Sequence, residues 1–391
     1  MLDDDLYKFT QSAVVLHNFP DLEVSYEFIN RGKTPFPVGF AERLKRQIFL
    51  LHMLRLSREE AKWLKSLNLM RPTYVEWLSG YQYNPFEVDV EQNGGELKIT
   101  IHGPWYRTIL WEVKLMSIIS ELYFMMMDAP IAECWRNRIV EKAEDLSEAE
   151  CLWCDMGTRR RRSLTVHDAV VNVMKNYSGF IGTSNPWLAM KHKINPIGTS
   201  AHESVMAMEC LFGANEANLR WLDLWRQYYG EKLNVALTDT FTTDVFLKQM
   251  MDIDLSRWQG YRQDSGDPYE WGNKMIMRFN RFGSATWTSW LEDKTFIFSD
   301  NLNVPKFIGI SEKFRPIVKS VIGGIGTHFT NDTFTPAQVD MGWKPLNMVI
   351  KLSGVKVGKK WIGAVKLSDD ACKYTGKPED IARVKSTLNL L

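Results

Sequence analysis

From about residue 150 onward, short apolar runs alternate with segments of helical periodicity. The apolar runs have the length of strands, and polar or glycine-rich residues follow each of them. They are Leu152–Met156, Phe180–Thr183, Val235–Leu237, Thr295–Phe298 and Val318–Ile322, with the less apolar Arg257–Arg262 as a sixth. Strands that alternate with helices predict βαβ units and a parallel sheet. About six units suit an irregular α/β barrel with fewer than eight regular units, and an open doubly wound sheet is the alternative.

The first third of the chain has a mixed pattern. It predicts strands over Glu23–Ile29 and Leu97–His102, and helices over residues 4–17, 39–52, 58–67, 71–80 and 106–127. Near the other end, Pro345–Leu352 predicts a strand with no helix after it, and Gly354–Gly363 predicts a hairpin. We therefore expect an α+β domain over residues 1–130, a barrel over 131–335, and a tail over 336–391 that returns to the N-terminal domain.

The composition favours no charged partner. Hydrophobic residues make up 45% and charged residues 24% of the 391 residues, and the net charge is +1. Such a chain creates no bulk field that attracts nucleic acid or a membrane, so we expect neither as a partner. The five cysteines are odd in number and irregularly spaced, which indicates a reducing compartment. Cys151 and Cys154 form a C-x-x-C pair without a second pair at zinc-ribbon spacing, so we expect small buried side chains.

The sequence shows no secretory signal, because aspartates occupy positions 3–5, where a signal peptide has basic and then apolar residues. The longest apolar segment, Tyr106–Met127, carries four charged side chains and is expected to be a buried helix rather than a membrane span. We therefore expect a cytoplasmic protein.

The richest cluster of chemical groups, Arg262–Pro268, follows the sixth apolar run. Within RQDSGDP, the planar donors of Arg262 could hold a small carboxylate, and Asp264 and Asp267 could hold a sugar hydroxyl or a hydrated metal ion. The alternative is a polar turn with an aspartate that caps the next helix. Similar groups at the other strand ends favour the first interpretation.

Polar or glycine-rich residues follow the remaining five runs as well. In chain order they are Arg159–Arg162, Ser184-Asn185-Pro186, Thr238-Asp239-Thr240, Ser299-Asp300-Asn301 and Gly323–His328. The strand ends of a barrel share one rim, where active sites form, so these groups predict a site for a phosphorylated sugar. The GGIGT segment could let backbone N–H groups approach a phosphate, although glycine loops are also common without that role.

His202 is the histidine, among seven, that we expect to carry chemistry. It follows the Gly-Thr-Ser turn at residues 198–200, at the expected start of a helix, and Glu203 stands beside it. A lone histidine is more often structural, but the other six lack this combination of hydroxyl groups and a carboxylate. His202 could act as a base or as a covalent phosphate acceptor.

Eleven segments, in the same order along nearly the whole chain, resemble the nicotinate phosphoribosyltransferase family. They are DDDLYKFTQSAV, YEFINRG, GPWYRTILWEV, DMGTRRRRS, GTSNPWLA, PIGTSAHE, NVALTDTFTTDVF, QGYRQDSGDP, FSDNLN, GGIGTHFTND and KPLNMVIKLS. The resemblance implies the type II phosphoribosyltransferase fold, an irregular α/β barrel plus an α/β domain made from both chain ends. It also implies an enzyme of NAD salvage that joins nicotinate to phosphoribosyl pyrophosphate. ATP hydrolysis would be coupled to this reaction through a phosphohistidine, and the matching histidine here is His202. This coupling would place the enzyme in the ligase class, with Mg²⁺ as cofactor.

The resemblance assigns a role to each matching residue. The pyridine ring would lie near Tyr7 and Met156, with its carboxylate at Arg262 and with Arg159 beside both the ring and the pyrophosphate. The other matches would face the ribose or Mg²⁺, namely Thr238, Asp264, Ser299 and Asp300, or the 5′-phosphate, namely Gly324, Gly326 and Thr327.

A few features depart from the family's common pattern. Met156 stands where phenylalanine is more common, and it would cover the ring through a looser sulfur contact. Gly323 stands where an aromatic residue is common. The sequence begins almost at the ring-binding motif, so the natural start could lie upstream.

Ser184 bears on the choice of base. Relatives that use nicotinamide have an aspartate here that accepts a hydrogen bond from the amide, whereas serine can donate one to the carboxylate of nicotinate. Ser184 therefore favours nicotinate. The alternatives are a nicotinamide phosphoribosyltransferase, a catalytically silent homologue that binds phosphoribosyl ligands, and an unrelated barrel enzyme for another sugar phosphate. The resemblance also suggests a homodimer in which Tyr7 reaches the partner's site.

Overall fold

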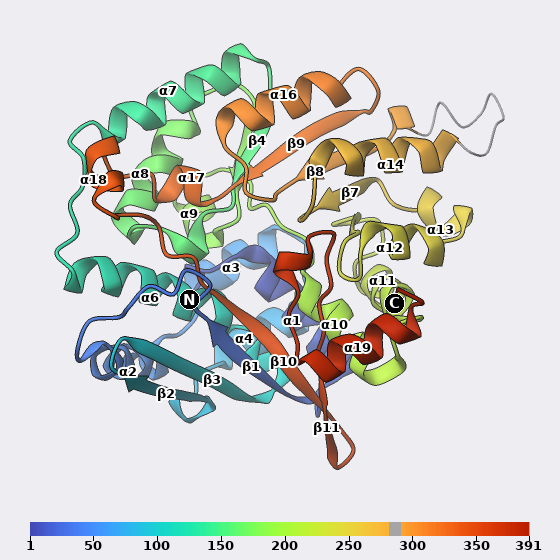
Figure 1. Ribbon diagram of the computed structural model, residues 1–391, viewed down its shortest axis with the longest axis horizontal. Helices are drawn as coiled ribbons and strands as arrows, with labels where there is room; N and C mark the ends of the chain where they lie inside the picture. The colour runs from blue at the N-terminus through green and yellow to red at the C-terminus, as the bar shows by residue number, and fades with distance from the viewer. Residues whose placement is uncertain (281–290, 391) are drawn as a thin grey trace. The chain divides into compact units, whose positions relative to one another are not determined.

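The computed structural model describes residues 1–280 and 291–390 (Figure 1). Residues 281–290, within the expected barrel segment, lie outside the described residues. The chain divides into two compact units. Unit 1 comprises Met1–Glu144, Asp155–Gly198 and Gly326–Leu352, and unit 2 comprises Asp145–Cys154, Thr199–Ile325 and Ser353–Leu391. The domain boundaries expected from the sequence stay a prediction.

A six-stranded parallel sheet forms from the strands that the apolar runs predict. Its order is β5-β4-β9-β8-β7-β6, with β5 and β6 at the two ends of the order. The strands are β4 (Leu152–Asp155), β5 (Phe180–Thr183), β6 (Val235–Leu237), β7 (Gly260–Gln263), β8 (Thr295–Phe298) and β9 (Ser320–Ile325). Within unit 2 the register is parallel from β6 to β9, with Val235 opposite Gly260, Gly260 opposite Thr295, and Thr295 opposite Ser320. The expected α/β class is confirmed.

A second sheet has the order β11-β10-β1-β3-β2 and antiparallel pairing between β1 and β3, β2 and β3, and β10 and β11. Its strands are β1 (Glu23–Ile29), β2 (Val88–Asn93), β3 (Glu96–Pro104), β10 (Val349–Val357) and β11 (Lys360–Gly363). The predicted hairpin is confirmed, since Gly354 pairs with Gly363. The sequence did not predict β2.

Helices connect these strands (Figure 1). The α-helices that precede β4 are α1 (Leu6–Asn18), α2 (Phe40–Leu50), α3 (Arg58–Ser66), α4 (Pro72–Gly80), α5 (Trp105–Thr108), α6 (Trp111–Met126) and α7 (Trp135–Glu148). Those that follow are α8 (Leu164–Met174), α9 (Pro186–His192), α10 (His202–Phe212), α11 (Ala217–Tyr229), α12 (Thr243–Gln249), α13 (Asp252–Ser256), α14 (Pro268–Asn280), α16 (Val304–Phe314), α17 (Thr327–Thr330), α18 (Pro336–Asp340) and α19 (Pro378–Thr387).

Two expectations about the second half of the chain were wrong. The last strand of the parallel sheet was placed at Val318–Ile322, but β9 begins at Ser320 and continues to Ile325, so Gly323 and Gly324 lie in a strand and not in a loop. The tail does contain a helix, α19, which begins at Pro378 and carries two acidic residues in its first turn. Proline and acidic residues both suit the first turn of a helix, so the signal was present in the sequence.

Aromatic side chains in unit 2 fix the end of β8. Trp271 of α14 contacts the rings of Phe296 and Phe298 at centroid distances of 5.0 and 5.2 Å. Phe314 of α16 stacks on Phe298 at 5.7 Å, and all four rings are buried. Contacts of this kind add to the free energy gained by burial. They hold in place the strand end that carries Ser299.

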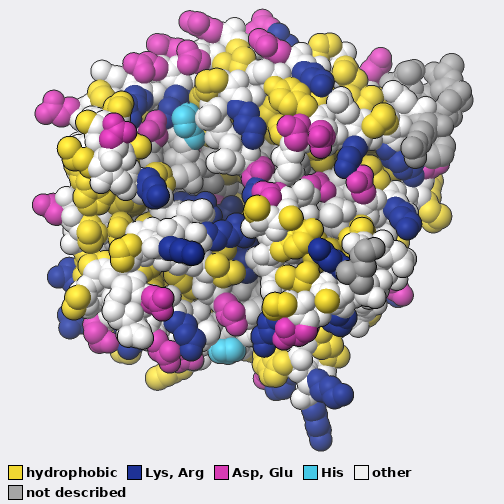
Figure 2. All heavy atoms as spheres, viewed as in Figure 1, with side chains coloured by type: hydrophobic (Ala, Val, Ile, Leu, Met, Phe, Trp, Pro, Cys, Tyr) yellow, Lys and Arg dark blue, Asp and Glu magenta, His cyan; other side chains and the backbone are white. Residues whose placement is uncertain are grey.

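The surface charge and the cysteines agree with what we expect from the composition, namely no strongly charged face and no disulfide. Over the face that Figure 2 shows, side chains of both signs are interspersed. Cys151 and Cys154 are buried, and all five cysteines are free. Within the described ranges, no helix is both long and apolar enough to cross a membrane.

Gly323 of β9 has no space for a side chain. A Cβ atom there would lie 2.7 Å from the ring of Phe307 on α16. Phe307 is fully buried, so its ring occupies the space beside the strand at this position. This packing gives a physical reason for glycine at position 323.

We expect Gly323→Ala to lower the free energy of unfolding by about 1–3 kcal/mol, because Phe307 must shift within a close-packed core. The measurement is the midpoint of thermal unfolding at a fixed scan rate. In a Phe307→Leu background the same change should cost less, and equal costs in both backgrounds would contradict the explanation. Gly80→Ala is the control, since a Cβ at this helical glycine meets nothing within 4 Å.

Candidate active site

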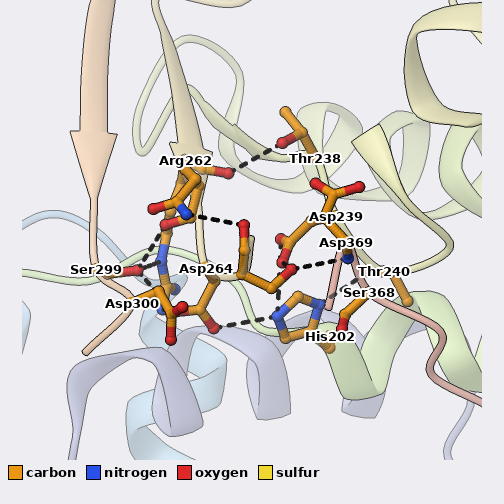
Figure 3. Close-up of polar contacts among 12 residues, drawn as sticks. His202, Thr238, Asp239, Thr240, Arg262, Asp264, Ser299, Asp300, Ser368 and Asp369 are labelled. Atoms are coloured by element: carbon orange, nitrogen blue, oxygen red, sulfur yellow. Dashed lines mark hydrogen bonds and ion pairs between the residues drawn. The ribbon is translucent and has the colours of Figure 1, made fainter. Parts of the chain in front are cut away.

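His202 is the first residue of α10 and is only 4% exposed. The turn before it is fixed at Ser200, whose hydroxyl accepts a hydrogen bond from Nε1 of Trp221 at 2.8 Å. Figure 3 shows the imidazole between Thr240 and Asp264, with Nδ1 3.1 Å from Thr240 Oγ1 and Nε2 3.1 Å from Asp264 Oδ2. These contacts on both nitrogens fix the orientation of the ring.

Asp264 is the carboxylate that joins the candidate residues of unit 2. Its Oδ1 accepts a hydrogen bond from Ser299 Oγ at 2.7 Å and lies 3.3 Å from Nη2 of Arg262, while Oδ2 faces His202. Burial opposes ionisation most strongly, but Arg262 and His202 together hold the pKa of Asp264 well below its ordinary value. The group is therefore an anion at neutral pH.

Asp239 is a second carboxylate beside His202, and the sequence placed it in the polar group after β6 without giving it a role of its own. It is completely buried, its Oδ1 lies 3.8 Å from His202 Nε2, and its Oδ2 accepts a hydrogen bond from Ser265. Burial raises the pKa of Asp239 above its ordinary value. Two carboxylates with opposite pKa shifts thus flank one imidazole nitrogen. The available signal was the position of Asp239 directly after β6, which it shares with Thr240.

The guanidinium of Arg262 is held by protein groups on three sides (Figure 3). Nε donates to Ser299 Oγ at 2.9 Å, Nη1 donates to the carbonyl of Ser200 at 3.2 Å, and Nη2 faces Asp264. The fork is therefore preorganised rather than free to rotate, which suits recognition of a planar anion.

The C-terminal tail contributes to the same cluster. Asp369 accepts hydrogen bonds from the N–H and the hydroxyl of Thr243 at 2.8 and 2.5 Å. The N–H groups of Leu367 and Ser368 donate to the carbonyl of Thr240 at 2.9 and 3.2 Å. Lys373 forms an ion pair with Asp300, which is one of the predicted site residues. From the sequence the tail was expected to return to the N-terminal domain, and none of its residues was expected at the site.

Thr238 is placed differently from the other candidates of unit 2. It is fully buried, and its hydroxyl accepts a hydrogen bond from Nε1 of Trp271 at 2.8 Å and donates to the carbonyl of Arg262 at 3.2 Å. The hydroxyl keeps one acceptor site beyond these two bonds, and its role at the ribose stays a prediction.

Unit 1 brings together a separate set of candidates, Tyr7, Arg159 and Ser184. Ser184 Oγ donates to Asp5 Oδ1 at 2.6 Å, and Arg159 lies 4.0 Å from Asp5 Oδ2 and 3.8 Å from Glu112 Oε1. Burial and the neighbouring Glu112 raise the pKa of Tyr7, so its phenol stays neutral. The set offers a neutral ring, a hydroxyl and a cation, which are suitable contacts for an anionic aromatic ligand.

Three arginines in unit 1 lie close enough to affect each other. Burial, followed by the charges of Arg159 and Arg31, lowers the pKa of Arg160 to about 10. Gathering guanidinium groups is unfavourable unless an anion offsets the repulsion, and phosphate oxygens are their common partners. Arg31 was not selected from the sequence, although it lies within the matching segment YEFINRG.

The glycine segment is less open than the sequence suggested. Gly324 lies within β9, whereas Gly326 precedes the four-residue helix α17, which begins at Thr327. A Cβ at Gly326 would lie 2.8 Å from the carbonyl oxygen of Met156, so glycine is needed for this close approach. Met156 itself is half-buried at the end of β4.

The fit to Mg²⁺ can be judged from the donor groups. Among the described residues, no group of three or more His, Cys, Asp or Glu side chains could hold a metal ion. Mg²⁺, however, usually keeps several waters and binds through one or two carboxylates together with substrate phosphates. Burial and, to a lesser extent, the charge of Asp264 raise the pKa of Asp300, so the two carboxylates lie near each other. They are the groups that would hold a hydrated ion, although Asp264 now pairs with Arg262 and Asp300 with Lys373.

Comparisons with known proteins agree along the whole chain. The model of the nicotinate phosphoribosyltransferase (NAPRTase) family matches residues 151–390, and the NAPRTase N-terminal domain matches residues 2–120. A nicotinate phosphoribosyltransferase of Desulforapulum autotrophicum is 41% identical over 389 residues, which are 98% of this chain and 96% of that protein. Another, of Chromohalobacter salexigens, is 40% identical over 398 residues, covering 100% of this chain and 98% of that protein.

Solved structures give the same result. The crystal structure of nicotinate phosphoribosyltransferase from Porphyromonas gingivalis has a TM-score of 0.93 and 34% identity, covering 99% of this chain and 98% of that one. The crystal structure of a putative nicotinate phosphoribosyltransferase from Saccharomyces cerevisiae has a TM-score of 0.91 and 34% identity, covering 100% of this chain and 98% of that one. The chain belongs to the nicotinate phosphoribosyltransferase family.

Proposed function

We propose that this protein joins nicotinate to phosphoribosyl pyrophosphate, giving nicotinate mononucleotide and pyrophosphate in NAD salvage. Family membership supports the reaction class. The observation that carries the proposal is the cluster of His202, Arg262 and Asp264, in which an ionised carboxylate, a fixed guanidinium and an oriented imidazole meet.

The transfer step suits these charges. Displacement at the anomeric carbon passes through an oxocarbenium-like state, so positive charge develops on the ribose while the leaving pyrophosphate is negative. An ionised Asp264 below the ribose would stabilise the first charge, and arginines would stabilise the second. Asp264 and Asp300 would hold a hydrated Mg²⁺, which supplies further positive charge at the pyrophosphate when it is bound.

ATP coupling would use His202. With Nε2–H donated to Asp264, the neutral ring has its lone pair on Nδ1. Nδ1 would attack the γ-phosphorus of ATP, forming an N–P bond as the bond to ADP breaks, and water would later release phosphate. Phosphorylation of His202 would tighten binding of the donor, and hydrolysis would favour release of the product.

The pyridine base would lie at the cluster of unit 1. Tyr7 and Met156 would cover the ring, and Arg159 would lie beside it. The role that the resemblance gives to Arg262 is to hold the carboxylate of the base. Ser184 would donate a hydrogen bond to nicotinate after turning from Asp5, which it contacts at 2.6 Å. Gly324, Gly326 and Thr327 would face the 5′-phosphate of the donor, and Ser299 would face the ribose.

One assay tests the function directly. Purified protein is supplied with phosphoribosyl pyrophosphate, Mg²⁺ and ATP, and nicotinate and nicotinamide are offered in parallel. Product from nicotinate alone would support both the reaction and the preference at Ser184. Product from nicotinamide alone would overturn the preference, and no product from folded protein would favour the silent homologue.

His202→Ala should abolish ATP hydrolysis linked to product formation and leave slow transfer without ATP, because the phosphate acceptor is lost. The measurement is ADP released per mononucleotide formed, together with ³²P retained by the protein from γ-labelled ATP. Unchanged ATP hydrolysis in the variant would contradict the phosphohistidine.

Arg262→Lys should raise the KM for nicotinate roughly 10- to 100-fold, since lysine keeps the charge but loses the bidentate fork. The KM for phosphoribosyl pyrophosphate should change much less. Equal increases in both KM values would show that Arg262 acts through Asp264 rather than on the carboxylate of the base.

Asp300→Asn should act on the other substrate, raising the KM for phosphoribosyl pyrophosphate by roughly tenfold or more, because one anionic contact is lost. The matched control is Asp370→Asn, which removes a carboxylate that caps the nearby N–H of Cys372 at 3.0 Å. A donor KM that is unaltered in Asp300→Asn would exclude contact with ribose or Mg²⁺.

A further inference from the structure

A second buried carboxylate, Asp155, lies at the end of β4 in unit 1. Its Oδ1 accepts the N–H of Gly157 at 2.9 Å, and its Oδ2 accepts hydrogen bonds from His167 Nε2 at 2.6 Å and Thr183 Oγ1 at 2.5 Å. Asp155, His167 and Thr183 are all 0% exposed. Both oxygens of this buried side chain have hydrogen-bond partners, as buried polar groups require, so its position is strictly defined.

These hydrogen bonds connect two loops that carry proposed ligands of the pyridine ring. The first loop follows β4 and contains Met156, and the second follows β5 and contains Ser184. The N–H of Ser184 donates to the carbonyl of Asp155 at 2.7 Å, and the N–H of Asn185 donates to Thr183 Oγ1 at 3.2 Å. Both loops are thus attached to the side chain and the backbone of one residue.

The same connection continues to α1. The N–H of Leu6 donates to the carbonyl of Ser184 at 2.8 Å, one residue before Tyr7. A displacement of Asp155 would therefore move Ser184 directly and would affect the helix that carries Tyr7.

His167 is the donor that comes from outside the two loops. It lies in the first turn of α8, whose cap is fixed by a hydrogen bond from the N–H of Val166 to Ser163 Oγ at 3.2 Å. Gly157 leaves no space for another arrangement, because a Cβ there would lie 2.2 Å from Thr330 Cγ2 and 2.9 Å from Asp155 Oδ1. The imidazole thus attaches the carboxylate, and through it both loops, to a regular helix.

We propose that His167 and Asp155 are positioning residues for the pyridine base: His167 orients Asp155, and Asp155 sets the spacing between Met156 and Ser184. This spacing decides how well Ser184 reaches the carboxylate of nicotinate, and so contributes to the preference over nicotinamide. The inference rests on the proposed function. The resemblance to known motifs assigned neither residue a role.

The chain offers a matched control on the same helix. Asp168, the residue after His167, contacts His192 Nε2 at 2.8 Å and Lys191 Nζ at 2.7 Å. This carboxylate–histidine pair joins α8 to α9, and the Asp168 side chain is 28% exposed. Among the described residues, the hydrogen bonds of the Asp168 side chain go to α9 and not to the loop after β4. Its loss should affect helix packing without changing the spacing of the two loops.

The experiment compares His167→Met, His167→Gln and Asp168→Asn in the full chain. For each variant, kcat and KM are measured with nicotinate, nicotinamide and phosphoribosyl pyrophosphate, and folding is checked by thermal unfolding. His167→Met should raise the KM for nicotinate about tenfold, because a hydrogen bond to a buried charge is lost, and should lower the nicotinate-to-nicotinamide ratio of kcat/KM. His167→Gln keeps a donor at the same reach and should restore most of both values. Asp168→Asn should leave them unchanged.

The opposite results are equally clear. The inference is wrong, and the proposed function stands, if His167→Met is active with the same nicotinate KM as the unaltered chain and the same nicotinate-to-nicotinamide ratio of kcat/KM. Equal increases in the KM for nicotinate and the KM for phosphoribosyl pyrophosphate would also overturn the inference, since they would indicate general damage to the protein. No product with the unaltered protein would overturn the proposed function and the inference together. If His167→Met does not fold, Thr183→Val removes another donor to Asp155 and should shift the same two values.

Discussion

The charge of Asp264 is the constraint on which the candidate site depends. The Asp264 side chain is 24% exposed, and its partial loss of water disfavours the charged form unless opposite charges and hydrogen-bond donors offset that loss. Arg262, Ser299 and His202 supply that compensation, and each is oriented by doing so. The arrangement is therefore cooperative, because removal of one partner weakens the contacts that orient the others. The same contacts that permit the charge also fix the imidazole and the guanidinium in the positions that chemistry requires.

Carboxylates at strand ends serve different purposes in the two units. In unit 2, Asp264 contacts groups that can bind or react with a ligand. In unit 1, Asp155 contacts a glycine N–H, Thr183 and His167, and it organises backbone rather than chemistry. The physical principle is the same, since each carboxylate needs hydrogen-bond donors in place of the water that it loses, completely at Asp155 and partly at Asp264. What differs is whether those partners are themselves reactive.

The periodicity of the sequence was sufficient for the fold class and for many elements. The strands at Glu23–Ile29, Phe180–Thr183 and Thr295–Phe298 have the bounds that their apolar runs predict. The error at the end of β9 has a cause that lies far away in the sequence. Two glycines were taken as the start of a loop, but β9 continues through them because Gly323 pairs with Phe298 of β8 and Phe307 fills the missing side chain's place. Long-range pairing of this kind leaves no signal in local sequence.

The sequence by itself determined the family, the class of fold and the strand ends at which reactive groups gather. It could not decide which of several adjacent polar residues turns toward His202. Thr238 and Asp239 are neighbours, yet Thr238 bonds to Trp271 while Asp239 flanks the imidazole. The tail residue Lys373 joins Asp300 across more than seventy positions of sequence. These choices belong to the tertiary structure, because the direction of a side chain after a strand and the partner of a buried charge are set by the elements packed around them.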